Sequence, residues 1–138
     1  ISTFYLPENR DTFDFTNYDY IVDAIDTVTA KIDMICYAKS VKTPIISCMG
    51  CGNRMDPTQL ELTDIYKTKN DPLAKVMRHE LKKRHINKCK VVCSKELPVK
   101  THYTEQDSKK RSVPGSTAFV PSAAGLICAS YIVRELIK

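Results

Sequence analysis

The stretch YDYIVDAIDTVTAKIDMICYAKSVKTPIISC, residues 18–48, decides the fold. Residues 18–24 form a short, almost continuous apolar run, which is typical of a strand buried on both faces of a parallel sheet. Residues 27–40 then repeat apolar side chains at helical spacing: Val28, Ile32, Ile35 and Cys36. The apolar residues 45–48 predict a second buried strand. A strand, a helix and a strand within about 30 residues indicate a right-handed parallel crossover, so we expect an α/β fold.

The rest of the chain continues this alternation. Residues 50–54 predict a turn, and residues 59–65 alternate polar and apolar side chains, as a more exposed strand does. Asp71 followed by Pro72 is a helix-start signal. The helix it predicts ends near His85 and buries four apolar side chains on one side: Leu73, Val76, Met77 and Leu81.

The C-terminal third predicts one more strand and one more helix. Residues 89–93 form an apolar run, and residues 120–137 carry apolar and small side chains that let a helix pack closely. Between them, residues 98–115 are polar and bounded by proline, so we expect a mobile crossover loop there.

Composition fits one modest domain. The chain has 138 residues, of which 43% are hydrophobic and 27% charged. No apolar stretch approaches the roughly 20 residues of a membrane span, and the N-terminus lacks the pattern of a signal peptide. We therefore expect a soluble, cytoplasmic protein with no membrane association and with its six cysteines reduced.

Two aspartates, Asp23 and Asp26, follow the first predicted strand. Open α/β sheets bind their ligands at the carboxyl ends of their strands, so these carboxylates are candidates for a ligand or metal site. Aspartate is also a common helix cap, and Asp26 stands just before the predicted helix. The spacing leaves both interpretations open.

Four cysteines raise the question of a zinc site, since Cys48 pairs with Cys51 and Cys89 with Cys93 at loose metal-ligand spacing. Residues four apart on one strand lie about 13 Å from each other, too far to share an ion. We therefore disfavour zinc. A redox or sulfur-transfer role for Cys48 and Cys51 is a further alternative.

Basic residues concentrate on the helix predicted after Asp71. The formal net charge is +5, and this helix carries five candidate contacts for nucleic acid: Lys75, Arg78, Lys82, Lys83 and Arg84. Clustered lysine and arginine bind phosphates, although a solvated surface gives the same pattern. The sequence contains no phosphate loop, dinucleotide fingerprint or serine-nucleophile motif, so the residues alone indicate an α/β piece without a complete active site.

Five motifs occur in one order along the chain: residues 23–28 with Lys31, residues 50–58, residues 71–76 with Arg78, residues 91–98, and residues 115–121 with Gly125. Together they resemble the tRNA threonylcarbamoyladenosine dehydratase branch of the ThiF/MoeB/HesA superfamily, whose members are similar to ubiquitin-activating enzymes. The resemblance extends from about residue 18 to residue 136. It implies the C-terminal part of a Rossmann-like adenylating domain, with a mixed sheet flanked by helices.

The resemblance also implies a chemistry. Such enzymes use ATP to adenylate a carboxylate. In the dehydratases the carboxylate belongs to threonylcarbamoyladenosine in tRNA, and its activation lets the side chain cyclise. In other branches the carboxylate is the C-terminus of a sulfur-carrier or ubiquitin-like protein. By motif, Asp26 holds Mg²⁺ and the ATP phosphates, with Asp23 beside it as a second cofactor-binding residue. The implied partners are tRNA, or a sulfur-carrier protein, and a second copy in a homodimer.

Two features depart from the family pattern. The glycine-rich ATP loop of the family, with its arginine and lysine, precedes the matched region, so we expect residues 1–138 to represent the C-terminal half of a domain and to be inactive alone. Cys51 replaces a small residue. A non-catalytic dimerisation or interaction module is therefore the alternative from another class.

Overall fold

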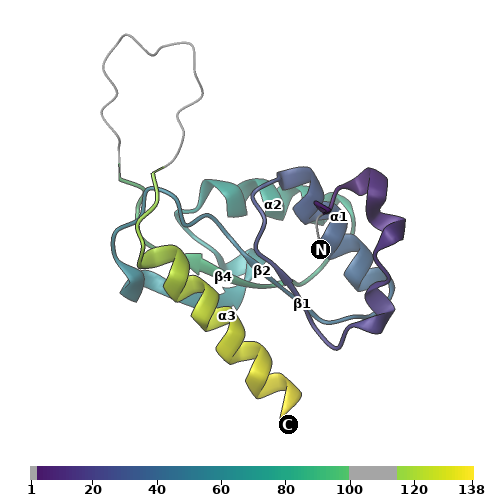
Figure 1. The fold of residues 1–138 in the computed structure, drawn as a ribbon. Helices are drawn as coiled ribbons and strands as arrows, with labels where there is room; N and C mark the ends of the chain where they lie inside the picture. The colour runs from purple at the N-terminus through teal and green to yellow at the C-terminus, as the bar shows by residue number, and fades with distance from the viewer. Residues whose placement is uncertain (1–2, 100–114) are drawn as a thin grey trace.

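A four-stranded sheet with helices on both faces forms the centre of the structure, a computed structural model that describes residues 3–99 and 115–138 (Figure 1). The strand order is β1-β2-β4-β3. Strand β1 (Ile21–Asp23) pairs in parallel with β2 (Ile45–Cys48), and β2 pairs in parallel with β4 (Lys90–Ser94). Strand β3 (Leu60–Asp64) runs antiparallel to β4. The expected mixed α/β sheet is confirmed.

The deciding stretch folds as its pattern predicts. Helix α1 (Val28–Ser40) connects β1 to β2, and the register pairs Ile21 with Ile45 and Asp23 with Ser47. Strand β1 is shorter than its apolar run, because only three residues pair with the neighbouring strand. This pairing places the carboxyl ends of β1 and β2 side by side.

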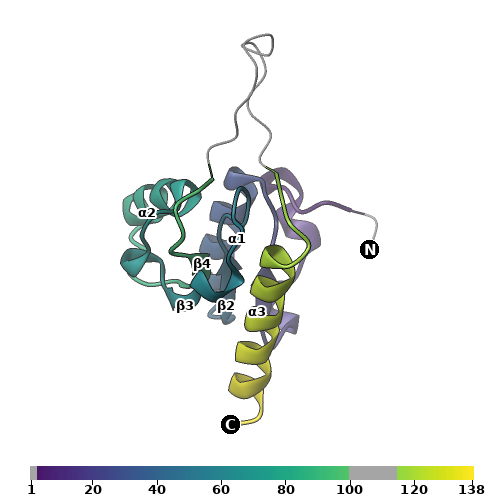
Figure 2. The same cartoon turned by 90° about the vertical axis from the view of Figure 1, so that its left-hand side faces the viewer.

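Helices cover both faces of the sheet. Helices α1 and α2 (Pro72–Lys83) cover one face, and α3 (Val120–Leu136) covers the other (Figure 2). The first face packs the larger cluster, which includes Ile35 and Met77; the second packs Ala124 and Cys128 against Ile46 and Val92. Burial on both faces explains why β2 and β4 are almost continuously apolar.

Helix α2 begins as expected but buries a different set of residues. Asp71 is its N-cap and accepts a 3.0 Å hydrogen bond from the amide of Ala74. The buried side chains are Ala74, Met77 and Leu81, whereas Val76 is 47% exposed. The prediction that Val76 is buried was wrong because it lies about 100° around the helix from Met77, toward solvent.

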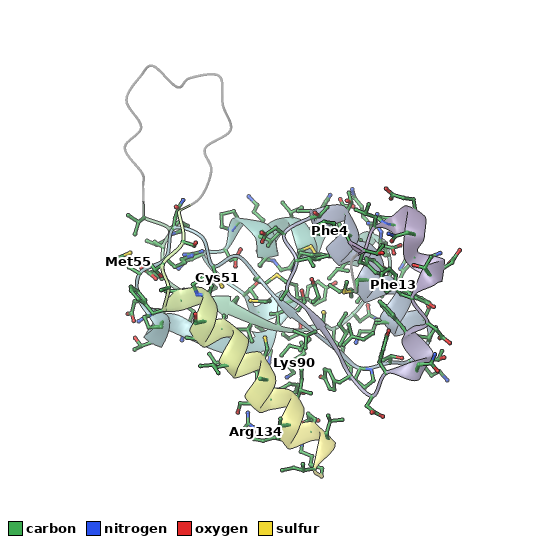
Figure 3. The ribbon with its side chains drawn as sticks, in the orientation of Figure 1. Phe4, Phe13, Cys51, Met55, Lys90 and Arg134 are labelled. Atoms are coloured by element: carbon green, nitrogen blue, oxygen red, sulfur yellow. The ribbon has the colours of Figure 1, made fainter. Side chains whose placement is uncertain are left out.

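The segment before β1 folds onto α1. It contains two short 3₁₀ helices, η1 (Pro7–Thr12) and η2 (Phe15–Asn17), and the rings of Phe15 and Tyr37 stack at 4.5 Å. Figure 3 shows Phe13 on the same side of the molecule as η1. Two further 3₁₀ helices, η3 (Pro57–Gln59) and η4 (Ile65–Lys67), flank β3.

Most of the predicted mobile loop, residues 100–114, lies outside the described residues. Among the helices of residues 3–99 and 115–138, none is long and apolar enough to cross a membrane.

Candidate functional site

The buried carboxylate of Asp23 ends β1. It forms an ion pair with Lys31 at 2.9 Å, and both side chains are wholly inaccessible to solvent. The hydroxyl of Ser47, on the neighbouring strand, donates to the same carboxylate oxygen, Oδ2. The amide of Ile25 adds a hydrogen bond of 3.3 Å. Asp23 is therefore occupied by protein groups and has no face open to a ligand.

The ammonium group of Lys31 connects the ends of two strands. Besides Asp23, it donates to the carbonyl of Ile25 at 3.1 Å and to the carbonyl of Cys48 at 2.8 Å. Ile25 follows β1, and Cys48 ends β2. A lysine ammonium has three N–H donors, so each one has a partner.

Asp26 lies in a different environment, at the exposed turn between β1 and α1. The N-cap of α1 is Thr27, whose side chain forms no capping hydrogen bond. Within residues 3–99 and 115–138, the Asp26 carboxylate forms no hydrogen bond or ion pair with another side chain or backbone group. It therefore does not cap the helix, and its oxygens face solvent.

The chemistry of these two aspartates fits a magnesium ion only at Asp26. Mg²⁺ takes hard oxygen ligands and is commonly held by one or two carboxylates, with water and phosphate oxygens completing its shell. Across the described residues, no three side chains of His, Cys, Asp or Glu converge as a metal cage. Asp26 can supply one such oxygen. Asp23 is buried and stabilises the turn that follows β1 by accepting a hydrogen bond from the amide of Ile25.

A groove of about 910 Å³ lies elsewhere, between η1, α1 and α2. Its lining includes Ile32, Asp33, Val76 and Glu80, but neither Asp23 nor Asp26. The groove reaches the first turn of α1 through Val28 and Thr29, but the carboxylates that follow β1 do not line it.

The cysteines divide between the two faces of the sheet. Cys89 and Cys93 belong to the cluster under α1 and α2, whereas Cys48 and Cys51 pack with Cys128 under α3. Figure 3 shows Cys51 beside α3. The four candidate zinc ligands therefore do not meet.

The Cys48, Cys51 and Cys128 thiols are coupled to one another. The Sγ atoms of Cys48 and Cys51 are 3.9 Å apart. Hydrogen bonding to Cys128, together with burial, raises the pKa of Cys48 to about 12. Hydrogen bonding to Cys48 raises the pKa of Cys51 and lowers that of Cys128. Raised pKa values at Cys48 and Cys51 do not favour a sulfur-transfer role, because the thiolate is the nucleophile.

The five basic residues of α2 and its C-cap fall into two groups. Three have partners within the protein: Arg78 donates to the carbonyl and hydroxyl of Thr68, while Lys83 and Arg84 pair with Glu80. These two pairs hold the pKa of Glu80 at about 2. Lys75 and Lys82 are exposed, and no side chain in the described part of the chain pairs with either. They lie seven residues apart, on one side of the helix.

Sequence reasoning gave Lys31 and Arg54 no role. Lys31 stands between Ala30 and Ile32 on the buried side of α1, and a charged residue between core positions was the available signal. Arg54 is also buried, and donates from Nη2 to the carbonyl of Asn70 at 2.8 Å. Its position in a turn gave no sign of burial.

The fold is a Rossmann-like α/β fold with an exposed carboxylate at the ligand edge of its sheet. No protein-family model matches the chain. In sequence it is 38% identical, over its whole length, to the tRNA threonylcarbamoyladenosine dehydratase of Bacillus subtilis, and 39% identical over 82 residues, 59% of the chain, to that of Escherichia coli. Over the part that it matches, the chain is similar to tRNA threonylcarbamoyladenosine dehydratases.

Solved structures agree with this relationship. The E. coli dehydratase TcdA in complex with AMP superposes on 99% of the chain with a TM-score of 0.82 and 29% identity, and the complex with ATP gives the same TM-score at 27% identity. The chain spans 58% of the B. subtilis protein, 31% of the E. coli sequence by alignment, and 56% of the E. coli structure.

Proposed function

We propose that the chain forms part of an ATP-dependent adenylating enzyme that acts on threonylcarbamoyladenosine in tRNA. The observation that carries this proposal is Asp26, an exposed carboxylate at the carboxyl end of β1 that has no partner in the described residues. The relatives support the same reading, because they are named for this reaction and one was solved with ATP. A tRNA substrate would place the reaction in the cytoplasm.

In this proposal each residue of the edge has a separate task. Asp26 holds Mg²⁺, which offsets the charge of the ATP phosphates while the adenylate forms. Asp23, Lys31 and Ser47 fix the turn that carries Asp26. The first turn of α1 lies next to Asp26 and presents backbone N–H groups, which favour an anion.

Recognition of tRNA is assigned to the exposed side of α2. Lys75 and Lys82 can bind phosphates without first breaking an ion pair with the protein, whereas Lys83 and Arg84 are paired with Glu80. Arg78 is held by Thr68 and contributes charge from a fixed position. Adenylation of a sulfur-carrier protein is the alternative within the same chemistry, and α2 would then bind an acidic protein surface.

A homodimer is the proposed assembly. The outer side of α3 exposes Leu126, Val133 and Ile137, at 71%, 55% and 76%. An apolar stripe of this kind favours association, which is also what a non-catalytic interaction module would show. ATP binding therefore distinguishes the enzyme from the module.

The test is calorimetric titration of ATP with and without Mg²⁺, on the full-length gene product and on this chain. We expect Mg²⁺-dependent binding by the full-length protein and a loss of at least tenfold in affinity, about 1.4 kcal/mol, in Asp26→Asn. Asp19→Asn, which removes a charge at another exposed position, is the control and should leave binding unchanged. Equal affinity in wild type and Asp26→Asn would refute the assignment of Asp26.

The substrate is tested separately by incubating full-length protein with ATP and tRNA that carries threonylcarbamoyladenosine. Cyclisation removes one water from the modified nucleoside, so mass spectrometry should detect the loss of that mass. If ATP binds but the tRNA is unchanged, while a sulfur-carrier protein with a free C-terminus is adenylated, the alternative substrate is correct.

A further inference from the structure

Lys31 is a charged side chain in the core of the protein. It is wholly buried in α1, with Ala30 and Ile32 as its buried neighbours along the chain. Removing an ammonium and a carboxylate from water costs several kcal/mol per ion, and an apolar pair of similar volume is often at least as stable. Stability alone therefore gives little reason for a lysine at this position.

The contacts of Lys31 indicate what it does instead. Its Nζ atom lies 2.9 Å from the Asp23 carboxylate, 3.1 Å from the carbonyl of Ile25 and 2.8 Å from that of Cys48. These groups lie at or just beyond the ends of two neighbouring strands, at the edge where this fold binds its ligands. One ammonium thus connects β1, β2 and the turn that follows β1.

The turn fixed in this way leads directly to Asp26. The carbonyl of Ile25 is bound by Lys31, and the amide of Ile25 is bound by Asp23, so the residue before Asp26 is held on both sides of its backbone. The side chain of Asp26 itself is exposed and has no partner in the described residues. Its position therefore depends on its backbone, which Lys31 holds.

We propose that Lys31 is a positioning residue for Asp26: its three hydrogen bonds fix the turn over residues 24–27 and so hold the Asp26 carboxylate where it can bind a magnesium ion. This inference rests on the proposed function. If the ion pair only stabilises the core, removing both charges together leaves no unpaired ion, and the turn and the affinity for ATP should then be unchanged.

The decisive variant is the double substitution Lys31→Met with Asp23→Asn, in the full-length gene product. It removes both charges together, so no unpaired ion stays buried, and most of the resistance to urea should be retained. The bonds to Ile25 and Cys48 are lost. We expect amide hydrogen exchange over residues 24–27 to accelerate at least tenfold, and affinity for ATP with Mg²⁺ to fall at least tenfold.

Two comparisons separate positioning from general damage. Thr43→Val removes a buried hydrogen bond to Phe15 at the opposite end of β2, so it should lower resistance to urea while leaving ATP affinity unchanged. In an Asp26→Asn background, the double substitution should cause no further loss of affinity, because Lys31 acts through Asp26.

The outcomes distinguish this inference from the function it rests on. If the wild-type protein binds no ATP, both fail. If Asp26→Asn weakens binding but the double substitution does not, or if its effect is undiminished in the Asp26→Asn background, the positioning role alone is refuted. If the double variant does not fold, Lys31→Arg is tested in its place. Arginine keeps the positive charge but cannot place one nitrogen among three acceptors. The same loss of ATP affinity and the same faster hydrogen exchange are expected.

Discussion

The backbone amide of Gly50 donates a 3.1 Å hydrogen bond to the carboxylate of Asp71, 21 residues later. The other oxygen of Asp71 caps α2 by accepting from the amide of Ala74 at 3.0 Å. One nearly buried side chain thus joins the loop after β2 to the start of α2. This contact fixes the loop directly beyond the strand end that Lys31 also holds.

Asp71→Ala should therefore cost more than an ordinary helix cap. Loss of the cap costs about 1 kcal/mol, and a buried amide left without a partner about 1–3 kcal/mol more. We expect the free energy of unfolding in urea to fall by about 2–4 kcal/mol. Asp71→Asn keeps one acceptor oxygen but places an NH2 group against the other backbone amide, so it should recover either the cap or the link to Gly50, but not both. Asp14→Ala, which removes the solvent-exposed cap of η2, is the control, and an equal loss there would contradict the linking role of Asp71.

The start of α2 could be predicted from the local sequence. Asp71 followed by Pro72 defines a helix start within two residues, and the parallel crossover follows from apolar runs alone, so both were predictable. The exposure of Val76 was not predictable, because a helical period fits a side with Leu73, Val76, Met77 and Leu81 about as well as the side that is actually buried.

The different environments of the two aspartates could not be predicted from the local sequence. Asp23 and Asp26 both follow β1, and either could have been the ligand. They differ only because Lys31 and Ser47, one on the next helix and one on the next strand, close around Asp23. Such contacts between distant residues have no pattern in the chain, so only the structure shows that protein groups occupy Asp23 and that Asp26 is exposed.

The thiols of Cys48 and Cys51 should react slowly. Hydrogen bonding to Cys128 and burial raise the pKa of Cys48 to about 12, so the thiol form predominates at pH 8. We expect iodoacetamide to modify both thiols far more slowly in the folded protein than in urea, with a rate that still rises above pH 9. Fast modification of either residue at pH 7 would instead support the sulfur-transfer alternative.

The outer side of α3 should drive self-association of this chain. Leu126, Val133 and Ile137 form one apolar stripe, and Figure 1 shows the C-terminal half of α3 extending away from the sheet. Sedimentation at increasing concentration should show a dimer. Val133→Lys should shift it toward monomer by at least tenfold in dissociation constant, whereas Asn87→Lys, which adds the same charge at an exposed position outside α3, should not. A monomer at all concentrations would refute the role of this stripe.

Two pairs of basic residues on α2 and its C-cap give a matched test of tRNA binding. Lys75→Ala with Lys82→Ala removes two positive charges that have no protein partner in the described residues. Lys83→Ala with Arg84→Ala removes two that Glu80 already pairs. Because each phosphate contact releases counterions, the first pair should weaken tRNA binding and reduce the slope of log affinity against log salt by about 2.

The second pair should change that slope less, since breaking the ion pairs with Glu80 offsets part of what a phosphate contact provides. Both variants lower the net charge equally, so a difference between them reports position and not overall charge. Filter binding of tRNA at several salt concentrations measures both slopes. Equal reductions would mean that α2 acts only through its total charge, and unchanged slopes in both would show that tRNA does not contact this helix.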